Sequence, residues 1–138
     1  MQQLTQEILR LCREYGECRV EVERMEEARR VKNALESVCS MARQRLDISD
    51  PALLLALLDA CEVTRDEGML QEVLDVVGRN LDRLAVSAES VKLLACCYYY
   101  VEEEECVERA GRMLEELRKM GRGEEELADV ETILEELT

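Results

Sequence analysis

Apolar side chains recur at helical spacing along the 138 residues of the chain, and we find no convincing alternation of the kind that predicts a β-strand. A spacing of three or four residues gathers apolar side chains on one face of a helix. The chain has one proline and six glycines, while 47% of its residues are hydrophobic. Few helix breakers and ample apolar content predict a single all-α domain over residues 1–138.

Turn and capping residues divide the chain into about seven helices. They are expected at about 3–15, 18–46, 51–64, 67–84, 88–101, 104–120 and from 124 onward. Gly16, Gly121 and Gly123 are expected to close helices, because glycine adopts the left-handed conformation without a steric penalty. Asp50 and Ser87 are expected N-caps.

The predicted helices fall into antiparallel pairs. Residues 1–50 form an N-terminal hairpin with a long second helix, 51–86 and 87–121 form two repeat-like pairs, and 122–138 form a C-terminal capping helix. The two middle pairs match at a shift of 36 residues, with Leu57, Leu58 and Cys61 aligned to Leu93, Leu94 and Cys97. Such a period is typical of α-solenoids, in which each pair buries its face on the next. We therefore expect a short α-solenoid, with an irregular helical bundle as the alternative.

Residues 87–121, "SAESVKLLACCYYYVEEEECVERAGRMLEELRKMG", resemble a pentatricopeptide or tetratricopeptide repeat. The segment "VERAGRMLEELRKMG" is similar to the second helix of a pentatricopeptide unit, and residues 51–86 resemble the family more faintly through "LLDACE". Between the leucine pair and "VERA" there is roughly one helical turn more than that family usually has, and residues 1–50 do not match. The resemblance implies an α/α superhelix that binds protein or, in the pentatricopeptide branch, single-stranded RNA.

The charge of the chain is concentrated in its C-terminal part. The net charge is −14, and residues 51–138 alone carry 22 acidic against nine basic residues. An acidic surface repels phosphate backbones and anionic lipids, so it disfavours nucleic acid and membrane partners and favours a basic protein partner. The alternative is that these charges only keep the surface solvated. The longest apolar run, residues 52–58, is far shorter than the roughly 20 residues of a membrane span.

The sequence contains no recognisable catalytic or metal-binding pattern. It has no His and no Cys-x-x-Cys, and its glycines are not arranged as a phosphate-binding loop. The seven cysteines are odd in number and fall mainly on apolar helical stripes, which favours reduced thiols in the cytoplasm or another reducing compartment. An organelle also fits if a transit peptide was removed. We expect no enzymatic activity and no cofactor.

The most unusual segment is "LLACCYYYVEEEEC", residues 93–106, at the end of the fifth expected helix. A helical wheel places four of its residues on the core side: Leu94, Cys97, Tyr98 and Val101. Three others point away: Cys96, Tyr99 and Tyr100. In a stack of helix pairs, the first helices line the concave surface, where exposed aromatic side chains serve as binding anchors. The alternative is that the first or the last helix covers them.

The shift of 36 residues aligns Tyr99 and Tyr100 with Val63 and Thr64. The candidate partner-binding residues are therefore Tyr99, Tyr100, Cys96, Val63 and Thr64. The sequence favours a non-enzymatic scaffold or adaptor that mediates protein–protein contacts. The alternative is a pentatricopeptide-like RNA-binding module of an organellar or RNA-processing complex, in which the two tyrosines stack on bases.

Overall fold

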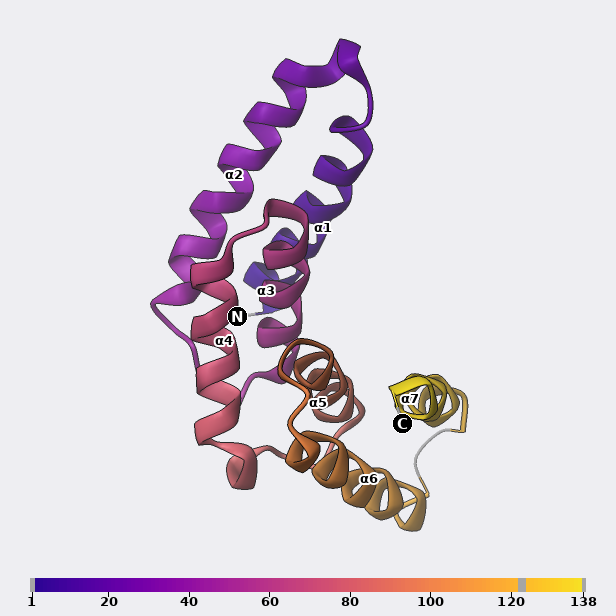
Figure 1. Cartoon of the computed structure of the whole chain (residues 1–138). Coiled ribbons are helices and arrows are strands. Elements are labelled where there is room, and N and C mark those ends of the chain that lie inside the picture. The colour runs from indigo at the N-terminus through magenta and orange to yellow at the C-terminus, as the bar shows by residue number, and fades with distance from the viewer. Residues whose placement is uncertain (1, 122–123, 138) are drawn as a thin grey trace.

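The computed structural model describes residues 2–121 and 124–137, and across these ranges it contains helices and no β-strand (Figure 1). The seven α-helices are α1 (Gln2–Cys18), α2 (Met25–Arg43), α3 (Pro51–Thr64), α4 (Glu67–Arg79), α5 (Ala88–Val101), α6 (Glu104–Lys119) and α7 (Glu124–Leu137). Two short 3-10 turns cover Val22–Arg24 and Leu81–Arg83. The all-α prediction is confirmed in these ranges, and so is the number of helices.

The odd-numbered helices contact one another in chain order: α1 packs on α3, α3 on α5, and α5 on α7. Each even-numbered helix packs on the helix that precedes it in the chain. Figure 1 shows the long α1–α2 hairpin at one end of the molecule and α6 and α7 at the other. The odd-numbered helices therefore form a series along which the binding residues can be placed.

Local capping explains where α3 and α5 begin. The Leu53 N–H donates to Asp50 Oδ1 at 3.2 Å, and the Ser90 N–H donates to Ser87 Oγ at 3.1 Å. Each cap satisfies an N–H group that has no partner inside the helix. Both predicted N-caps are confirmed, and α3 starts with Pro51 at its first positions. Because α5 is anchored at this end, the tyrosines at its other end have a defined position.

The helix ends were predicted less accurately. Gly16 does not terminate α1, which continues to Cys18, where the side chain is only 1% exposed. Burial of Cys18 extends the helix, and Gly16 does not have a positive φ. The next helix begins at Met25 rather than at 18, and α4 ends at Arg79 rather than at 84. Gly121 does end α6 with a φ of 70°, whereas Gly123 lies outside the described residues.

Equivalent points of the two middle pairs lie 37 residues apart. This step relates Pro51 to Ala88 at the starts of α3 and α5, and Glu67 to Glu104 at the starts of α4 and α6. It also relates two left-handed residues that end α3 and α5, Arg65 with φ 57° and Glu102 with φ 53°. The shift of 36 residues expected from the sequence is therefore one residue short.

The burial pattern of α3 and α5 follows the same step of 37 residues. Six buried residues of α3 have a buried counterpart on α5: Leu53, Leu54, Ala56, Leu57, Leu58 and Ala60. Their counterparts are Ser90, Val91, Leu93, Leu94, Ala95 and Cys97. Both helices are apolar around most of their circumference, so a slip of one residue still aligns apolar with apolar. This is why the sequence comparison selected the wrong shift.

One continuous hydrophobic core joins the helices from Ile8 on α1 to Val130 on α7. A charged contact adds to it between α2 and α4, where Arg43 Nε donates to Glu72 Oε2 at 2.9 Å. A second Arg43 nitrogen, Nη1, lies 3.7 Å from Asp66 Oδ2 at the start of α4. These contacts tie the start of α4 to the end of α2, and Asp66 also belongs to the candidate site.

Candidate functional site

Tyr99 and Tyr100 occupy the last turn of α5 and contact each other edge to face, with ring centroids 5.2 Å apart. The Tyr99 side chain is 71% exposed, and Tyr100 is half-buried. Neither α1 nor α7 covers Tyr99, so the alternative in which another helix hides it is wrong. Edge-to-face packing restricts both rings, so little further ordering is needed when a partner contacts them.

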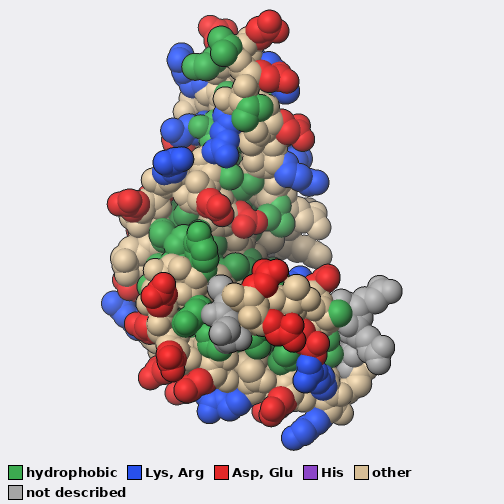
Figure 2. Space-filling view, turned by 45° about the vertical axis from the view of Figure 1, so that its right-hand side comes forward, with side chains coloured by type: hydrophobic (Ala, Val, Ile, Leu, Met, Phe, Trp, Pro, Cys, Tyr) green, Lys and Arg blue, Asp and Glu red, His purple; other side chains and the backbone are tan. Residues whose placement is uncertain are grey.

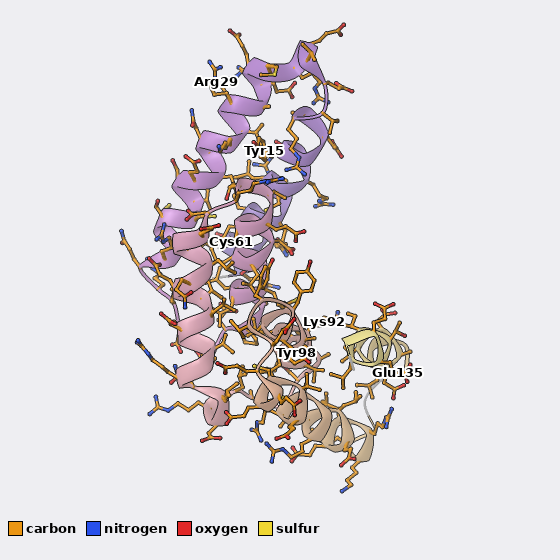
Figure 3. The ribbon with its side chains drawn as sticks, viewed as in Figure 1. Tyr15, Arg29, Cys61, Lys92, Tyr98 and Glu135 are labelled. Atoms are coloured by element: carbon orange, nitrogen blue, oxygen red, sulfur yellow. The ribbon has the colours of Figure 1, made fainter. Side chains whose placement is uncertain are left out.

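The helical wheel of α5 was correct for Cys97, which is buried, and incorrect for Val101, which is 41% exposed. Glu102 takes the left-handed conformation directly after Val101. The helix therefore ends at Val101, and this last residue is not covered as its position in the wheel predicts. Tyr98 is half-buried (Figure 3).

A groove of about 370 Å³ lies between the tyrosines and the junction of α3 and α4. We call it the tyrosine groove. Its polar and aromatic lining consists of Glu62, Arg65, Asp66, Glu67, Tyr99 and Tyr100. Three carboxylates and one guanidinium therefore surround the aromatic pair.

A second groove, of about 480 Å³, lies on the other side of α3. We call it the α1–α3 groove. It is lined by Leu9, Cys12, Arg13, Asp59, Glu62 and Val63. Glu62 is the residue that lines both grooves. The two grooves are thus adjacent parts of one surface formed by α1, α3 and α5.

The remaining predicted site residues differ in position. Val63 lines the α1–α3 groove, and its carbonyl oxygen accepts a hydrogen bond from Arg19 Nη1 at 3.3 Å. Cys96 is half-buried on α5, close enough to Asp59 and Glu62 for their charges to act on its thiol. Thr64 lines neither described groove, and its hydroxyl donates to the Ala60 carbonyl at 2.6 Å.

The step of 37 residues changes the correspondence between α3 and α5. The counterparts of Cys96, Tyr99 and Tyr100 are Asp59, Glu62 and Val63, rather than a set that includes Thr64. Leu9, Cys12 and Arg13 have the same i, i+3, i+4 spacing on α1 and face the α3 set across the α1–α3 groove. Residues at this spacing share one side of a helix.

The surface carries two carboxylates, Asp59 and Glu62, that form no ion pair within the described part of the chain, although Arg13 and Arg65 line the two grooves. Both carboxylates are exposed. Partial desolvation raises the pKa of the Asp59 carboxyl, and the charge of Glu62 raises it further. Burial likewise raises the pKa of the Tyr100 hydroxyl, with a second contribution from Glu62. A cation placed here would be stabilised by both carboxylates.

Acidic side chains extend beyond these grooves. Figure 2 shows acidic side chains interspersed with hydrophobic ones over the middle and lower parts of the molecule. The nearest additional cation on α5 is Lys92, one and two helical turns before Cys96 and Tyr99 (Figure 3). The surface therefore combines apolar contact area with a field that attracts positive charge.

The cysteines are poor nucleophiles in this environment. Burial raises the pKa of Cys12 to about 11 and that of Cys39, Cys61 and Cys97 to about 12. Such thiols stay protonated at neutral pH, whereas the thiolate is the reactive form. In the described ranges, no group of three or more Cys, Asp or Glu side chains has a metal-binding arrangement.

Sequence reasoning missed Glu62, Arg65, Asp66 and Glu67 on one groove, and Leu9 and Arg13 on the other. A signal exists for Glu62, since it lies three residues after Asp59 on the same side of α3. No signal in the sequence places α1 beside that side of α3.

No family model matches this chain, and no curated protein or solved structure matches it either. No helix in the described ranges is both long and apolar enough to cross a membrane.

Proposed function

We propose that this chain is a non-enzymatic helical-repeat adaptor domain that binds a protein partner on the surface shared by α1, α3 and α5. The observation that carries the proposal is Tyr99, a 71% exposed aromatic side chain beside a groove with uncompensated carboxylates. Exposed tyrosines next to a groove are typical of binding hot spots.

The repeat character is supported by the two middle helix pairs. Their N-caps, helix starts and left-handed C-terminal residues recur after 37 residues, and so does their burial pattern. The contacts of α1 with α3, α3 with α5 and α5 with α7 are those expected of stacked pairs. The resemblance of residues 87–121 to pentatricopeptide and tetratricopeptide units agrees with this interpretation.

The charge distribution favours a basic protein surface as the partner. Residues 51–138, which include α3 and α5, carry 13 more acidic than basic residues. Complementary charge raises the rate of association and excludes acidic partners. RNA is the less favoured alternative, because Glu62, Asp66 and Glu67 line the groove beside the tyrosines and would repel its phosphates.

The proposal is tested by quantitative affinity enrichment with the chain as bait, using the wild type and Tyr99→Ala/Tyr100→Ala. The matched control is Met41→Ala, because Met41 is 60% exposed on α2 outside both grooves. We expect a specific protein partner to be retained by the wild type and Met41→Ala and lost from the double variant. A partner that binds all three equally would contradict the proposed surface. Ribonuclease-sensitive recovery would instead favour the RNA alternative.

A further inference from the structure

We propose that the surface around Glu62 recognises a short extended segment carrying one Arg or Lys and one aliphatic residue, three positions apart. The basic side chain would enter the tyrosine groove, and the aliphatic side chain would enter the α1–α3 groove. This recognition mode rests on the proposed adaptor function and specifies the chemistry of its partner.

The tyrosine groove has the groups needed to hold a cation. Tyrosine rings attract a guanidinium or ammonium placed over their faces. Glu62 and Glu67 form no hydrogen bond or ion pair among the described residues, so both carboxylates are available. Asp66 is already engaged, because its Oδ1 accepts the Met69 N–H at 3.0 Å and its Oδ2 lies 3.7 Å from Arg43 Nη1. Arg65 opposes a bound cation, but the acidic groups outnumber it.

The α1–α3 groove suits an aliphatic side chain. Leu9, Cys12 and Val63 provide its apolar lining, while Arg13 and Asp59 supply one charge of each sign. Leu9 is 37% exposed, so part of its side chain is open to the groove. Burying an aliphatic side chain against this lining removes apolar surface from water on both partners.

The basic and the aliphatic side chain of the bound segment must reach from one groove to the other across α3. Both grooves border α3 and meet at Glu62, and neighbouring packed helices lie about 8–10 Å apart. A polyproline II segment rises about 3.1 Å per residue and returns to the same side every three residues. Residues i and i+3 of such a segment are therefore about 9 Å apart on one side, which is comparable to the spacing of neighbouring packed helices.

Charge decides between possible occupants of this surface. A second copy of the chain would bring a net charge of −14 to a surface that is already acidic. RNA would bring phosphates to the same carboxylates. Of these three occupants, only a basic segment is attracted by both the tyrosine pair and the unpaired carboxylates, and it is therefore the favoured one.

The test uses fluorescein-labelled peptides that contain Arg-Pro-Pro-Leu or Leu-Pro-Pro-Arg between glycine spacers. The two prolines hold the polyproline II conformation, and the two orders cover both directions of binding. In control peptides, neutral citrulline replaces arginine or alanine replaces leucine. Binding is measured by fluorescence anisotropy and mapped by backbone NMR shifts on the full chain.

We expect one orientation to bind with a dissociation constant on the order of 0.1–1 mM, which is typical of a short exposed contact. Citrulline should weaken binding at least tenfold, and so should Glu62→Gln. Glu36→Gln, at an exposed glutamate on α2 outside both grooves, should leave it unchanged. Leu9→Ala should weaken the leucine peptide and leave the alanine peptide unaffected.

Equal affinity for arginine and citrulline peptides, or no binding up to about 5 mM, would overturn the inference. Tighter binding of a uridine octamer than of either peptide would also overturn it in favour of RNA. The adaptor proposal fails separately. The adaptor proposal is wrong if the protein partner binds Tyr99→Ala/Tyr100→Ala as well as the wild type, even when the peptides need arginine to bind. It stands if the double variant loses the partner, even when the arginine and citrulline peptides bind equally.

Discussion

Replacing Glu102 by glycine should stabilise this protein. Glu102 ends α5 with φ 53° and ψ 29°, and its N–H donates to the Tyr98 carbonyl at 2.8 Å. A side chain with a Cβ pays about 1–2 kcal/mol in this left-handed conformation. Glycine removes that cost, but it loses about 0.5–1 kcal/mol through the greater freedom of the unfolded chain. The net gain from backbone conformation is therefore about 0.5–1 kcal/mol.

Charge adds to this gain at Glu102 and subtracts from it at the equivalent residue, Arg65. A carboxylate near the negative end of a helix dipole is unfavourable by about 0.3–1 kcal/mol, whereas a guanidinium there is favourable by a similar amount. Glu102→Gly should therefore stabilise by about 1–2 kcal/mol, and Arg65→Gly by about 0–0.5 kcal/mol. For a chain of this size, the former corresponds to a rise in Tm of about 3–8 °C.

Thermal unfolding at neutral pH, followed by far-ultraviolet circular dichroism, checks this order of stabilities. Glu102→Ala isolates the charge contribution, because alanine keeps the Cβ and removes the carboxylate. Glu108→Gly, inside α6, should lower stability by about 1 kcal/mol, since glycine is unfavourable within a helix. A Tm for Glu102→Gly at or below that of Glu102→Ala would show that Glu102 is not left-handed.

Three further outcomes test the core, the thiols and the acidic surface. Leu94→Ala should cost about 2–5 kcal/mol in denaturant unfolding, because the side chain is fully buried, while exposed Met41→Ala should change stability by less than about 0.5 kcal/mol. In the native protein, a thiol reagent should react rapidly with at most one cysteine, Cys96, and after unfolding it should react with all seven. A rapid phase of thiol reaction that persists in Cys96→Ser would contradict this. Asp59→Asn should raise Tm at neutral pH, because the raised pKa of Asp59 means that its charged form is disfavoured in the folded state. This advantage should disappear in acid, where Asp59 is protonated, and a benefit that is equal at both pH values would refute the electrostatic cause.

Helix identity and the starts of α3 and α5 were predictable from the sequence because they depend on interactions over a few residues. Asp50, Pro51 and Ser87 act on N–H groups within three positions of themselves, so their roles can be inferred without knowing what packs against them. The apolar periodicity also identified Cys97 as a core residue. The same local information placed Tyr99 on the side of α5 that points away from the core.

The end of α1, the shift between the helix pairs and the shape of the binding surface were decided by tertiary contacts. Gly16 favours a helix end, but burial of Cys18 against neighbouring helices outweighs that local preference. The all-round apolar character of α3 and α5 conceals their relative shift, which only the helix bounds and the burial pattern reveal. Glu62 meets Tyr99 on one side and Leu9 on the other because α3 lies between α1 and α5. These neighbours come from three distant segments, and local periodicity carries no information about which helices pack side by side.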